Sequence, residues 1–96
     1  VDALTRNLAV EWGPLGIRVV GIAPGPIAGT EGVARLLPAE RQSEAIGLVP
    51  LRRLGVVDDI ATAAVFLCSD LAAFVNGTTL VVDGGLSLAT GHAIRP

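Results

Sequence analysis

Histidine and cysteine are scarce in this sequence, and their scarcity excludes several kinds of catalytic site. The 96 residues contain one cysteine, Cys68, and one histidine, His92. Two such residues at distant positions cannot form a metal-ligand cluster, and a lone histidine in the tail does not predict a Ser-His-Asp or Cys-His arrangement. No glycine-rich phosphate loop of the dinucleotide-binding or P-loop type follows a strand-like segment. We therefore expect no metal site and no complete catalytic apparatus in these residues.

Long apolar runs, strong charge and paired cysteines are also missing. No apolar run reaches the roughly 18 residues that a membrane helix needs, and the chain opens on Val1-Asp2 without the basic segment and apolar core of a signal peptide. The net charge of -2 argues against a nucleic-acid surface. Because a single cysteine cannot form an internal disulfide, we expect a cytoplasmic chain in which Cys68 is a small buried hydrophobe on a helix. Neither a membrane nor a nucleic acid is an expected partner.

The apolar residues, which make up 51% of the sequence, gather into two strand-like runs. Residues 17–22 are apolar nearly throughout apart from Arg18, which is a candidate partner for Glu11, and residues 78–82 form the second run. Strands that are apolar on both faces occur in parallel sheets covered by helices on both sides. Two strands in 96 residues cannot supply those layers. We therefore expect the C-terminal part of a larger α/β domain, with a self-sufficient small domain as the alternative.

Helical periodicity predicts three helical regions around these strands. The first covers residues 1–12, and its expected apolar face consists of Val1, Leu4, Leu8 and Trp12. The second is a pair of short pieces at 33–37 and 39–46, and the third begins at Asp58-Asp59, which suit a helix N-terminus. The expected apolar face of the third helix consists of Ile60, Ala64, Leu67 and Leu71. Because helices lie between two strands, we expect a βαβ unit with parallel strands and a right-handed crossover.

The first strand-like run ends in a turn that is rich in proline and glycine, Ala23-Pro24-Gly25-Pro26-Ile27. Pro24 and Pro26 lack an amide hydrogen, so we expect the sheet ladder to end before them. Gly25 lets the backbone pass close to a neighbour or a ligand. Ligands in open parallel α/β sheets lie just past the carboxyl ends of the strands. The turn therefore suits a flat ring resting on backbone, and a plain strand-to-loop turn is the alternative.

Five local patterns carry a family resemblance when they are taken together. They are LTRNLAVE at 4–11, GIRV at 16–19, APGPI at 23–27, PLRRLG at 50–55 and VVDGG at 81–85. In this order and spacing they resemble the C-terminal half of a short-chain dehydrogenase/reductase, and the resemblance extends from Val1 to about Leu86. Residues 24–32 are most similar to the peroxisomal-type 2,4-dienoyl-CoA reductases.

The resemblance implies that the chain is the C-terminal portion of a Rossmann-like, doubly wound parallel sheet that binds NAD or NADP. The whole chain, 1–96, would then belong to one oxidoreductase domain and supply its last two strands. In the family the proline-glycine turn lies under the nicotinamide, which assigns Pro24 and Gly25 to cofactor binding. The backbone two residues after the glycine meets the carboxamide, and that residue is Ile27. Thr30 is a further candidate for the carboxamide or the phosphates, although it stands one residue later than the commonest spacing.

The resemblance also implies that these residues lack the catalytic groups of the family. The family's catalytic tyrosine and lysine precede the first helix, and this sequence has no tyrosine, while all seven basic residues are arginine. Val20 stands where the family often has asparagine. Hydride transfer to a carbonyl needs an acid near the developing alkoxide, and the lysine lowers the pKa of that acid. We therefore assign no catalytic residue and expect no turnover by these 96 residues alone.

The activity that the resemblance implies is an NAD(P)-dependent oxidoreduction of a carbonyl or enoyl thioester, such as 2,4-dienoyl-CoA or a 3-oxoacyl thioester; a sugar or an alcohol is the other possible substrate. The glycine-punctuated segment 28–50 is a candidate substrate lid, with a disordered or purely structural connection as the alternative. Candidates to line an acyl site are Leu36, Leu37, Ile46 and Leu48. Candidates to meet a coenzyme A phosphate through a guanidinium group are Arg35, Arg41, Arg52 and Arg53. Solvated or structural arginines are the alternative.

A function of another class is also open. A chain of this length with so much apolar surface is expected to associate with copies of itself. The alternative is therefore a non-catalytic, self-associating module, inactive without an N-terminal half. A homo-oligomer is expected under either hypothesis.

Overall fold

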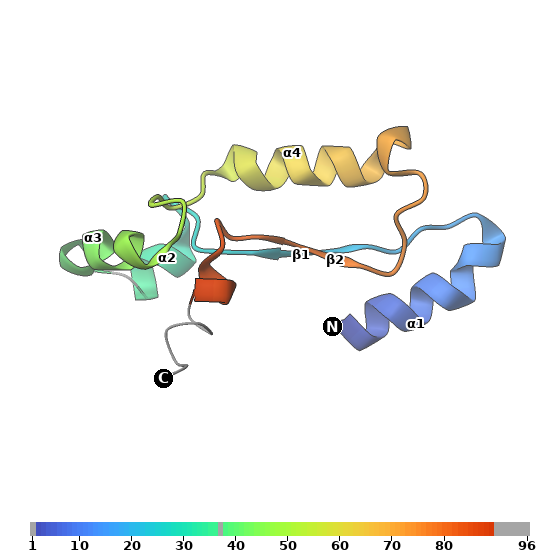
Figure 1. Cartoon of the computed structure of the whole chain (residues 1–96), viewed down its shortest axis with the longest axis horizontal. Helices are drawn as coiled ribbons and strands as arrows, with labels where there is room; N and C mark the ends of the chain where they lie inside the picture. Colours follow the sequence, from blue (N-terminus) through green and yellow to red (C-terminus); the bar gives the residue numbers. More distant parts are fainter. Residues whose placement is uncertain (1, 37, 90–96) are drawn as a thin grey trace.

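The computed structural model describes residues 2–36 and 38–89. In chain order the elements are α1 (Asp2–Trp12), the 3-10 turn η1 (Gly13–Leu15), β1 (Gly21–Pro24), α2 (Glu31–Leu36), α3 (Ala39–Leu48), α4 (Val57–Cys68), the 3-10 turn η2 (Asp70–Ala72) and β2 (Thr79–Val82). Strands β1 and β2 pair in parallel with Gly21 opposite Thr79. Helix α4 runs along one side of this sheet and α1 lies on the other, while α2 and α3 lie beyond the carboxyl ends of the strands (Figure 1). The predicted α/β class, parallel pairing and helix order are thus confirmed.

Strand β1 begins later than the sequence predicted and includes Pro24. The amides of Gly21 and Gly25 donate to the carbonyls of Thr78 and Val82 at 3.0 and 2.9 Å, so alternate residues of β1 face β2. Pro24 lies between these donors, and its missing N–H faces away from β2. The expectation that the ladder ends before Pro24 is therefore wrong, because a proline interrupts only the side of a strand to which it would donate.

Helix α1 buries a different face from the one that its periodicity predicted. Thr5 and Ala9 are the buried residues, four positions apart, whereas Leu4 is 61% exposed and Val10 is 79% exposed. A β-carbon added to Gly21 of β1 would lie 3.7 Å from the Thr5 hydroxyl oxygen, which places this face of the helix against the start of the strand. The small residues of α1 therefore allow a close approach to β1, and Val1 of the predicted face lies outside the described residues.

The Asn76-Gly77 turn joins three segments at the amino ends of the strands. The Asn76 amide donates to the carbonyl of Ala9 in α1 at 3.1 Å and accepts from the backbone N–H of Val19 at 2.9 Å. The Gly77 N–H donates to the carbonyl of Val19 at 2.8 Å, with Gly77 in the left-handed region at φ 74. The turn that the sequence predicted is confirmed. The side chain of Asn76 also fixes α1 against the segment that leads into β1.

Arg18 does not pair with Glu11. Its guanidinium group donates to the carbonyls of Val75 and Ser69 at 3.3 and 3.4 Å, and within the described residues it forms no ion pair. Arg18 therefore ties the chain before β1 to the segment that follows α4.

Residues 28–50 contain two helices, as the sequence predicted, with different bounds. Helix α2 begins at Glu31, two residues earlier than expected, because the Thr30 hydroxyl accepts from the N–H of Val33 at 3.3 Å. Helix α3 runs on to Leu48. Val49, which follows it, is 1% exposed.

Helix α4 confirms part of the predicted apolar face and corrects the rest. Leu67 is buried, but Leu71 is 84% exposed in η2, where Ala72 takes the inward position. Cys68 lies on a helix, as expected, but it is exposed and not buried. The helix ends at Cys68, so its periodicity no longer determines where Leu71 points.

The described residues do not close around a large core. The radius of gyration is 15.8 Å, whereas a compact domain of this length has about 12.5 Å. Among the residues that the structure describes, five apolar ones are buried: Ala9, Val33, Val49, Leu67 and Ala72. This open arrangement disagrees with a self-sufficient small domain and leaves apolar faces of α1 and α4 without a partner in the described structure. None of the helices described is both long enough and apolar enough to cross a membrane.

Candidate functional site

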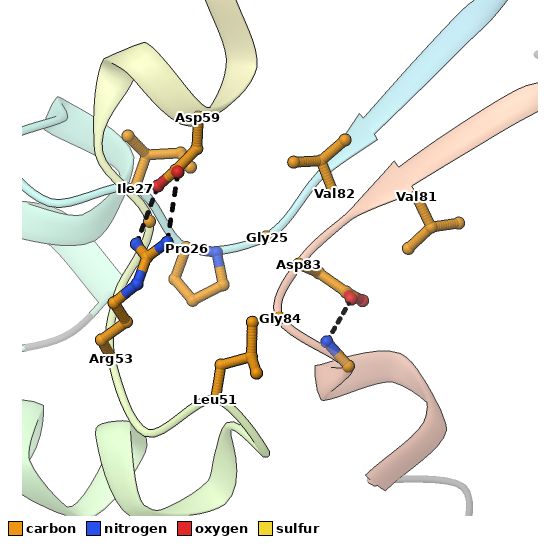
Figure 2. Close-up of a pocket in the computed structure, with 12 residues that line it drawn as sticks. Gly25, Pro26, Ile27, Leu51, Arg53, Asp59, Val81, Val82, Asp83 and Gly84 are labelled. Carbon is orange, nitrogen blue, oxygen red and sulfur yellow. Dashed lines mark hydrogen bonds and ion pairs between the residues drawn. The ribbon is translucent and has the colours of Figure 1, made fainter. Parts of the chain in front are cut away.

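A cavity of about 320 Å³ opens at the carboxyl ends of β1 and β2. It is lined by residues 25–27 after β1, by residues 81–85 at the end of β2, and by Leu51, Arg53, Gly55 and Asp59 from the segment that leads into α4. Figure 2 shows Pro26, Leu51, Arg53 and Asp83 around this opening. The cavity lies where ligands bind in parallel α/β sheets.

Gly25 allows the ends of the two strands to pass close together. A β-carbon at Gly25 would lie 2.7 Å from the β-carbon of Asp83 and 2.8 Å from its α-carbon, closer than real side chains approach. The close approach that the sequence predicted for Gly25 is thus made to a neighbouring strand. Pro24, the last residue of β1, is exposed and does not line the cavity.

Ile27 is held by a short parallel bridge to Gly55. The Ala28 N–H donates to the Gly55 carbonyl at 2.8 Å, and the Gly55 N–H donates to the Pro26 carbonyl at 3.0 Å. A β-carbon at Gly55 would lie 2.7 Å from the Ile27 Cδ1 atom, so the Ile27 side chain packs directly on Gly55. The bridge fixes the backbone of the turn at the edge of the cavity.

Thr30 contacts Ile27 directly. Its hydroxyl donates to the Ile27 carbonyl at 2.7 Å, and its backbone N–H donates to the same oxygen at 3.3 Å. The Ile27 N–H itself donates no hydrogen bond within the described residues. The structure thus brings Ile27 and Thr30 together, and it leaves one backbone donor available beside the cavity.

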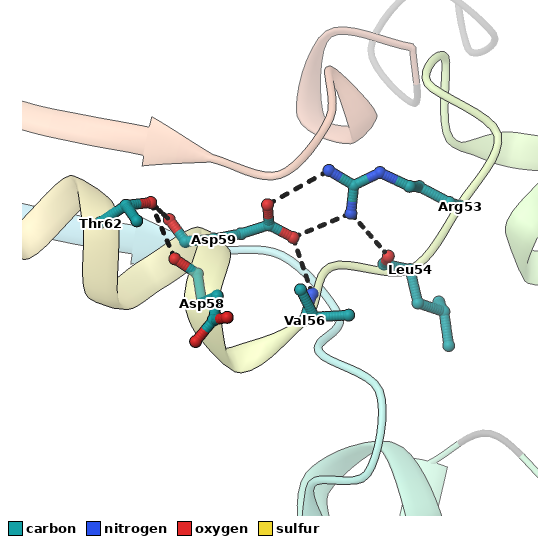
Figure 3. Close-up of polar contacts among 6 residues, drawn as sticks. All are labelled: Arg53, Leu54, Val56, Asp58, Asp59 and Thr62. Carbon is teal, nitrogen blue, oxygen red and sulfur yellow. Dashed lines mark hydrogen bonds and ion pairs between the residues drawn. The ribbon is translucent and has the colours of Figure 1, made fainter.

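Arg53 and Asp59, which both line the cavity, form an ion pair that Figure 3 shows in detail. The two guanidinium nitrogens donate to the two carboxylate oxygens at 2.8 and 3.2 Å. The carboxylate accepts a third hydrogen bond, from the backbone N–H of Val56 at 2.7 Å. The hydrogen bond from Arg53, followed by that from Val56, lowers the pKa of Asp59 from 3.8 to about 2. Asp59 is therefore ionised at neutral pH and is not a proton donor.

Asp83 closes the turn after β2. Its carboxylate accepts from the backbone N–H groups of Gly85 at 2.8 Å and Ser87 at 3.0 Å, which lowers its pKa, with Ser87 as the larger cause. The turn packs on Val49, since a β-carbon at Gly84 would lie 2.8 Å from a Val49 methyl group. The Leu51 N–H donates to the Gly84 carbonyl at 3.2 Å. The carboxylate of Asp83 thus stabilises the turn to which the segment after α3 is attached.

Three of the four arginines considered for phosphate binding have partners within the described structure. Arg35 pairs with Glu31 at 2.9 Å, and Arg53 pairs with Asp59. Arg52, at φ 57, donates to the carbonyls of residues 47 and 49 at 2.8 and 3.0 Å. Arg41 is exposed on α3, and its side chain makes no hydrogen bond or ion pair within the described residues.

The acyl-site candidates lie apart from the cavity or outside the description. Ile46 is half-buried and Leu48 is 58% exposed, and neither lines the cavity. The side chain of Leu36 and the whole of Leu37 lie outside the described residues, as does His92. In the part of the chain that is described, no three histidine, cysteine or acidic side chains are placed to hold a metal ion.

The sequence did not reveal the site roles of Gly55, Arg53 and Asp59. PLRRLG and the acidic pair at 58–59 were recognised as separate features, one a family pattern and the other a helix start. The six-residue spacing from Arg53 to Asp59 crosses a loop, so no helical periodicity relates the two. The feature of the sequence that could have indicated this pairing is a carboxylate at the third helical position, preceded by a loop with basic residues.

The parallel strands, the helices on both sides and the cavity at the carboxyl ends have the arrangement of a Rossmann-type sheet. Residues 1–87 match a family model described as enoyl-(acyl carrier protein) reductase. The chain belongs to that family, a branch of the short-chain dehydrogenases/reductases, as its five sequence patterns predicted.

Curated relatives match most or all of this chain at about 50% sequence identity. The peroxisomal 2,4-dienoyl-CoA reductase of Saccharomyces cerevisiae is 50% identical over 100% of this chain and 34% of its own length. That of Arabidopsis thaliana is 52% identical over 93% of this chain and 30% of its own length. The chain spans about a third of the length of the curated relatives it matches.

Solved structures confirm the fold. A short-chain dehydrogenase from Bacillus anthracis is 50% identical, with a TM-score of 0.79 over 90% of this chain and 33% of its own. A provisionally assigned 2-deoxy-d-gluconate 3-dehydrogenase from Agrobacterium tumefaciens, with bound NADP, is 43% identical, with a TM-score of 0.81 over 91% of this chain and 35% of its own. The predicted partial Rossmann-like sheet is thereby confirmed.

Proposed function

We propose that these residues form part of an NAD(P)-dependent oxidoreductase that reduces an enoyl thioester, with 2,4-dienoyl-CoA as the leading substrate. The observation that carries the proposal is the 46–54% identity, over most of this chain, to relatives that are named as peroxisomal 2,4-dienoyl-CoA reductases. A 3-oxoacyl thioester is the second candidate substrate, because it carries the same thioester-linked coenzyme A or acyl carrier and has a carbonyl group that can be reduced.

For the cofactor, we assign NAD or NADP to the edge formed by Pro24, Gly25, Ile27 and Thr30. The Ile27 N–H is aimed away from its bridge to Gly55 and has no acceptor within the described residues, so it suits the oxygen of a carboxamide. Pro24 and Gly25 offer a surface without long side chains for a flat ring. The hydroxyl of Thr30 orients the Ile27 carbonyl. When bound, the nicotinamide supplies or accepts the hydride.

For the substrate, we assign residues 28–50 to a lid within a single oxidoreductase domain that includes the whole chain, 1–96. The segment is attached beside the cavity at both of its ends, through Ile27 and through Val49. Arg41 is the arginine whose guanidinium group is available for a coenzyme A phosphate, since the other three have partners.

Steady-state kinetics of the full-length protein test this proposal. The oxidation of NADH and of NADPH would be followed by absorbance with 2,4-dienoyl-CoA and with 3-oxoacyl-CoA. We expect kcat/KM to be highest for 2,4-dienoyl-CoA. If a carbonyl substrate is turned over and the dienoyl thioester is not, the assignment of the substrate is wrong. If no substrate causes oxidation of NADH or NADPH, the assignment as an oxidoreductase is wrong.

We propose self-association as the second candidate function, because large apolar side chains are exposed on several elements. The exposed fractions are 79% for Val10 on α1, 69% for Val65 on α4 and 104% for Phe74. Such a surface favours a homo-oligomer. Analytical ultracentrifugation of the full-length protein, with and without NADPH, distinguishes the two hypotheses. An oligomer that binds no cofactor favours the non-catalytic module.

We propose a cytoplasmic location, because an exposed free thiol at Cys68 fits a reducing compartment. Several relatives are named as peroxisomal proteins. Imaging of the full-length protein with a fluorescent tag at either end tests the proposal, and co-localisation with peroxisomes would overturn it.

A further inference from the structure

We propose that Arg53 and Asp59 are positioning residues for the cofactor: they hold Gly55 in place, and Gly55 in turn fixes the direction of the Ile27 N–H. The inference rests on the proposed function, because it concerns the donor assigned there to the carboxamide. Neither side chain is proposed to touch the cofactor.

The first step is the orientation of the Ile27 peptide groups. Two hydrogen bonds to Gly55 flank Ile27, one from the Ala28 N–H at 2.8 Å and one to the Pro26 carbonyl at 3.0 Å. In a parallel pair the residue between two such bonds directs its own N–H and C=O to the opposite side. The Ile27 carbonyl is occupied by Thr30. Gly55 therefore determines where the remaining Ile27 N–H points.

The second step is how Gly55 itself is held. Arg53 donates to the carbonyl of Leu54 at 3.1 Å, and Asp59 accepts from the N–H of Val56 at 2.7 Å. The ion pair between Arg53 and Asp59 closes a ring around residues 54–56 (Figure 3). Asp59 lies in the first turn of α4, which packs on both strands, so the ring is attached to the sheet. We refer to residues 53–59 as the staple.

The third step separates the staple from an ordinary helix cap. A capping carboxylate needs only the backbone N–H of Val56. Here the guanidinium group of Arg53 adds two contacts to the carboxylate and one to the backbone on the far side of Gly55. A bidentate pair fixes direction as well as distance. The added contacts therefore constrain Gly55 rather than the helix.

The chain offers a matched comparison in Arg35 and Glu31. That ion pair is formed by a single contact of 2.9 Å one helical turn apart, with both side chains more than three-quarters exposed. The Arg53 and Asp59 side chains are 54% and 29% exposed. An exposed pair within one helix constrains no backbone beyond that helix. Loss of the Arg35 pair should therefore leave the site unchanged.

The test compares cofactor binding with the binding of fragments that lack the nicotinamide. In the full-length protein, Arg53→Gln, Arg53→Lys and the control Arg35→Gln would be measured with NADH and NADPH by fluorescence of the dihydronicotinamide. The fragments are ADP-ribose and 2′-phospho-ADP-ribose, measured by calorimetry. For Arg53→Gln we expect the Kd of the whole cofactor to rise about tenfold and that of the fragment to change less than about twofold. Arg53→Lys should fall between, and Arg35→Gln should match the wild type.

Two results would overturn the inference. If Arg53→Gln weakens cofactor and fragment equally, the staple supports folding and does not position the nicotinamide; if it weakens neither, the staple has no role in binding. Asp59→Asn is a second variant, measured at temperatures where its circular dichroism is native. It must also raise the Kd of the whole cofactor more than the Kd of the fragment. Binding of fragment and cofactor with equal affinity by the wild type would instead refute the proposed cofactor site.

Discussion

Gly25 passes Asp83 so closely that a β-carbon on the glycine would lie 2.7 Å from the β-carbon of the aspartate. This contact joins the ends of β1 and β2 at the edge of the cavity, and it leaves no room for a side chain. We therefore expect Gly25→Ala to destabilise the full-length protein by about 1–3 kcal/mol, the usual effect of overpacking. Chemical denaturation would measure the change.

The control for this substitution is Gly47, which lies in α3 and where an added β-carbon would meet no atom within 4 Å outside the helix backbone. Gly47→Ala should stabilise the protein by about 0.5–1 kcal/mol, because alanine loses less conformational entropy in a helix. Equal effects of the two substitutions would show that the contact with Asp83 is not responsible.

The side chain of Asn76 connects α1 to the segment before β1 through two hydrogen bonds. Asn76→Ala removes the bonds to Ala9 and Val19, and since each such bond contributes about 0.5–1.5 kcal/mol, we expect the free energy of unfolding to fall by about 1–3 kcal/mol. Asn7→Ala, which removes an exposed amide from the same helix, should change stability by less than about 0.5 kcal/mol. A loss at Asn76 no greater than that at Asn7 would contradict the role of the turn.

Asp59 should titrate far below an ordinary aspartate. Its pKa in the folded protein is lowered from 3.8 to about 2, first by Arg53 and then by the Val56 N–H. Because the folded value is the lower one, the ionised form stabilises the fold above pH 3.8, and this contribution is lost as the pH falls through about 2. Carboxyl carbon NMR of the wild type should give a midpoint near 2. Arg53→Gln should move the midpoint upward, and an unchanged midpoint would remove Arg53 as the cause.

Arg41 supplies a test of coenzyme A recognition. We expect Arg41→Ala in the full-length protein to raise KM for 2,4-dienoyl-CoA several-fold, roughly the 1 kcal/mol of an exposed charge contact, with little change in kcat. The same acyl group on N-acetylcysteamine lacks the nucleotide phosphates and should show no effect of the substitution. A KM that rises equally for both thioesters would indicate a structural role for Arg41.

The 96 residues by themselves should not catalyse NAD(P)H oxidation, because they hold no tyrosine or lysine to protonate a developing oxyanion. The measurement is the absorbance assay with 2,4-dienoyl-CoA, run in parallel on the full-length protein. Turnover by the shorter chain at a comparable rate would mean that other residues serve as the acid.

The sequence predicted those features that depend on local chemistry or on order along the chain. Parallel pairing followed from two strands separated by helices, and the turn at residues 76–77 followed from Asn-Gly. The family followed from five spaced patterns. The position of Pro24 within β1 was not predictable in this way, because it depends on which side of the strand faces the partner.

The incorrect assignments concern side chains whose environment is set by packing. Periodicity identified α1 and α4, but it cannot say which faces find a partner within the described residues, and it extended the apolar face of α4 to Leu71, which lies beyond the end of that helix; Leu4 and Leu71 are both exposed. The pair of Arg53 and Asp59 lay in two motifs that were interpreted separately. Only the folded backbone, with Gly55 pressed on Ile27, brings these motifs into one unit.

The two attachments of residues 28–50 have a consequence for how the protein can vary. One end is fastened at Ile27 to Gly55, and the other at Val49 and Leu51 to the turn after β2. The first anchor uses backbone bonds to Gly55, and the second combines the Leu51 N–H with the packing of Val49 on Gly84. We therefore expect substitutions at the exposed positions of α2 and α3 to leave the pairing of the two strands unchanged, because both attachments lie at the ends of the segment.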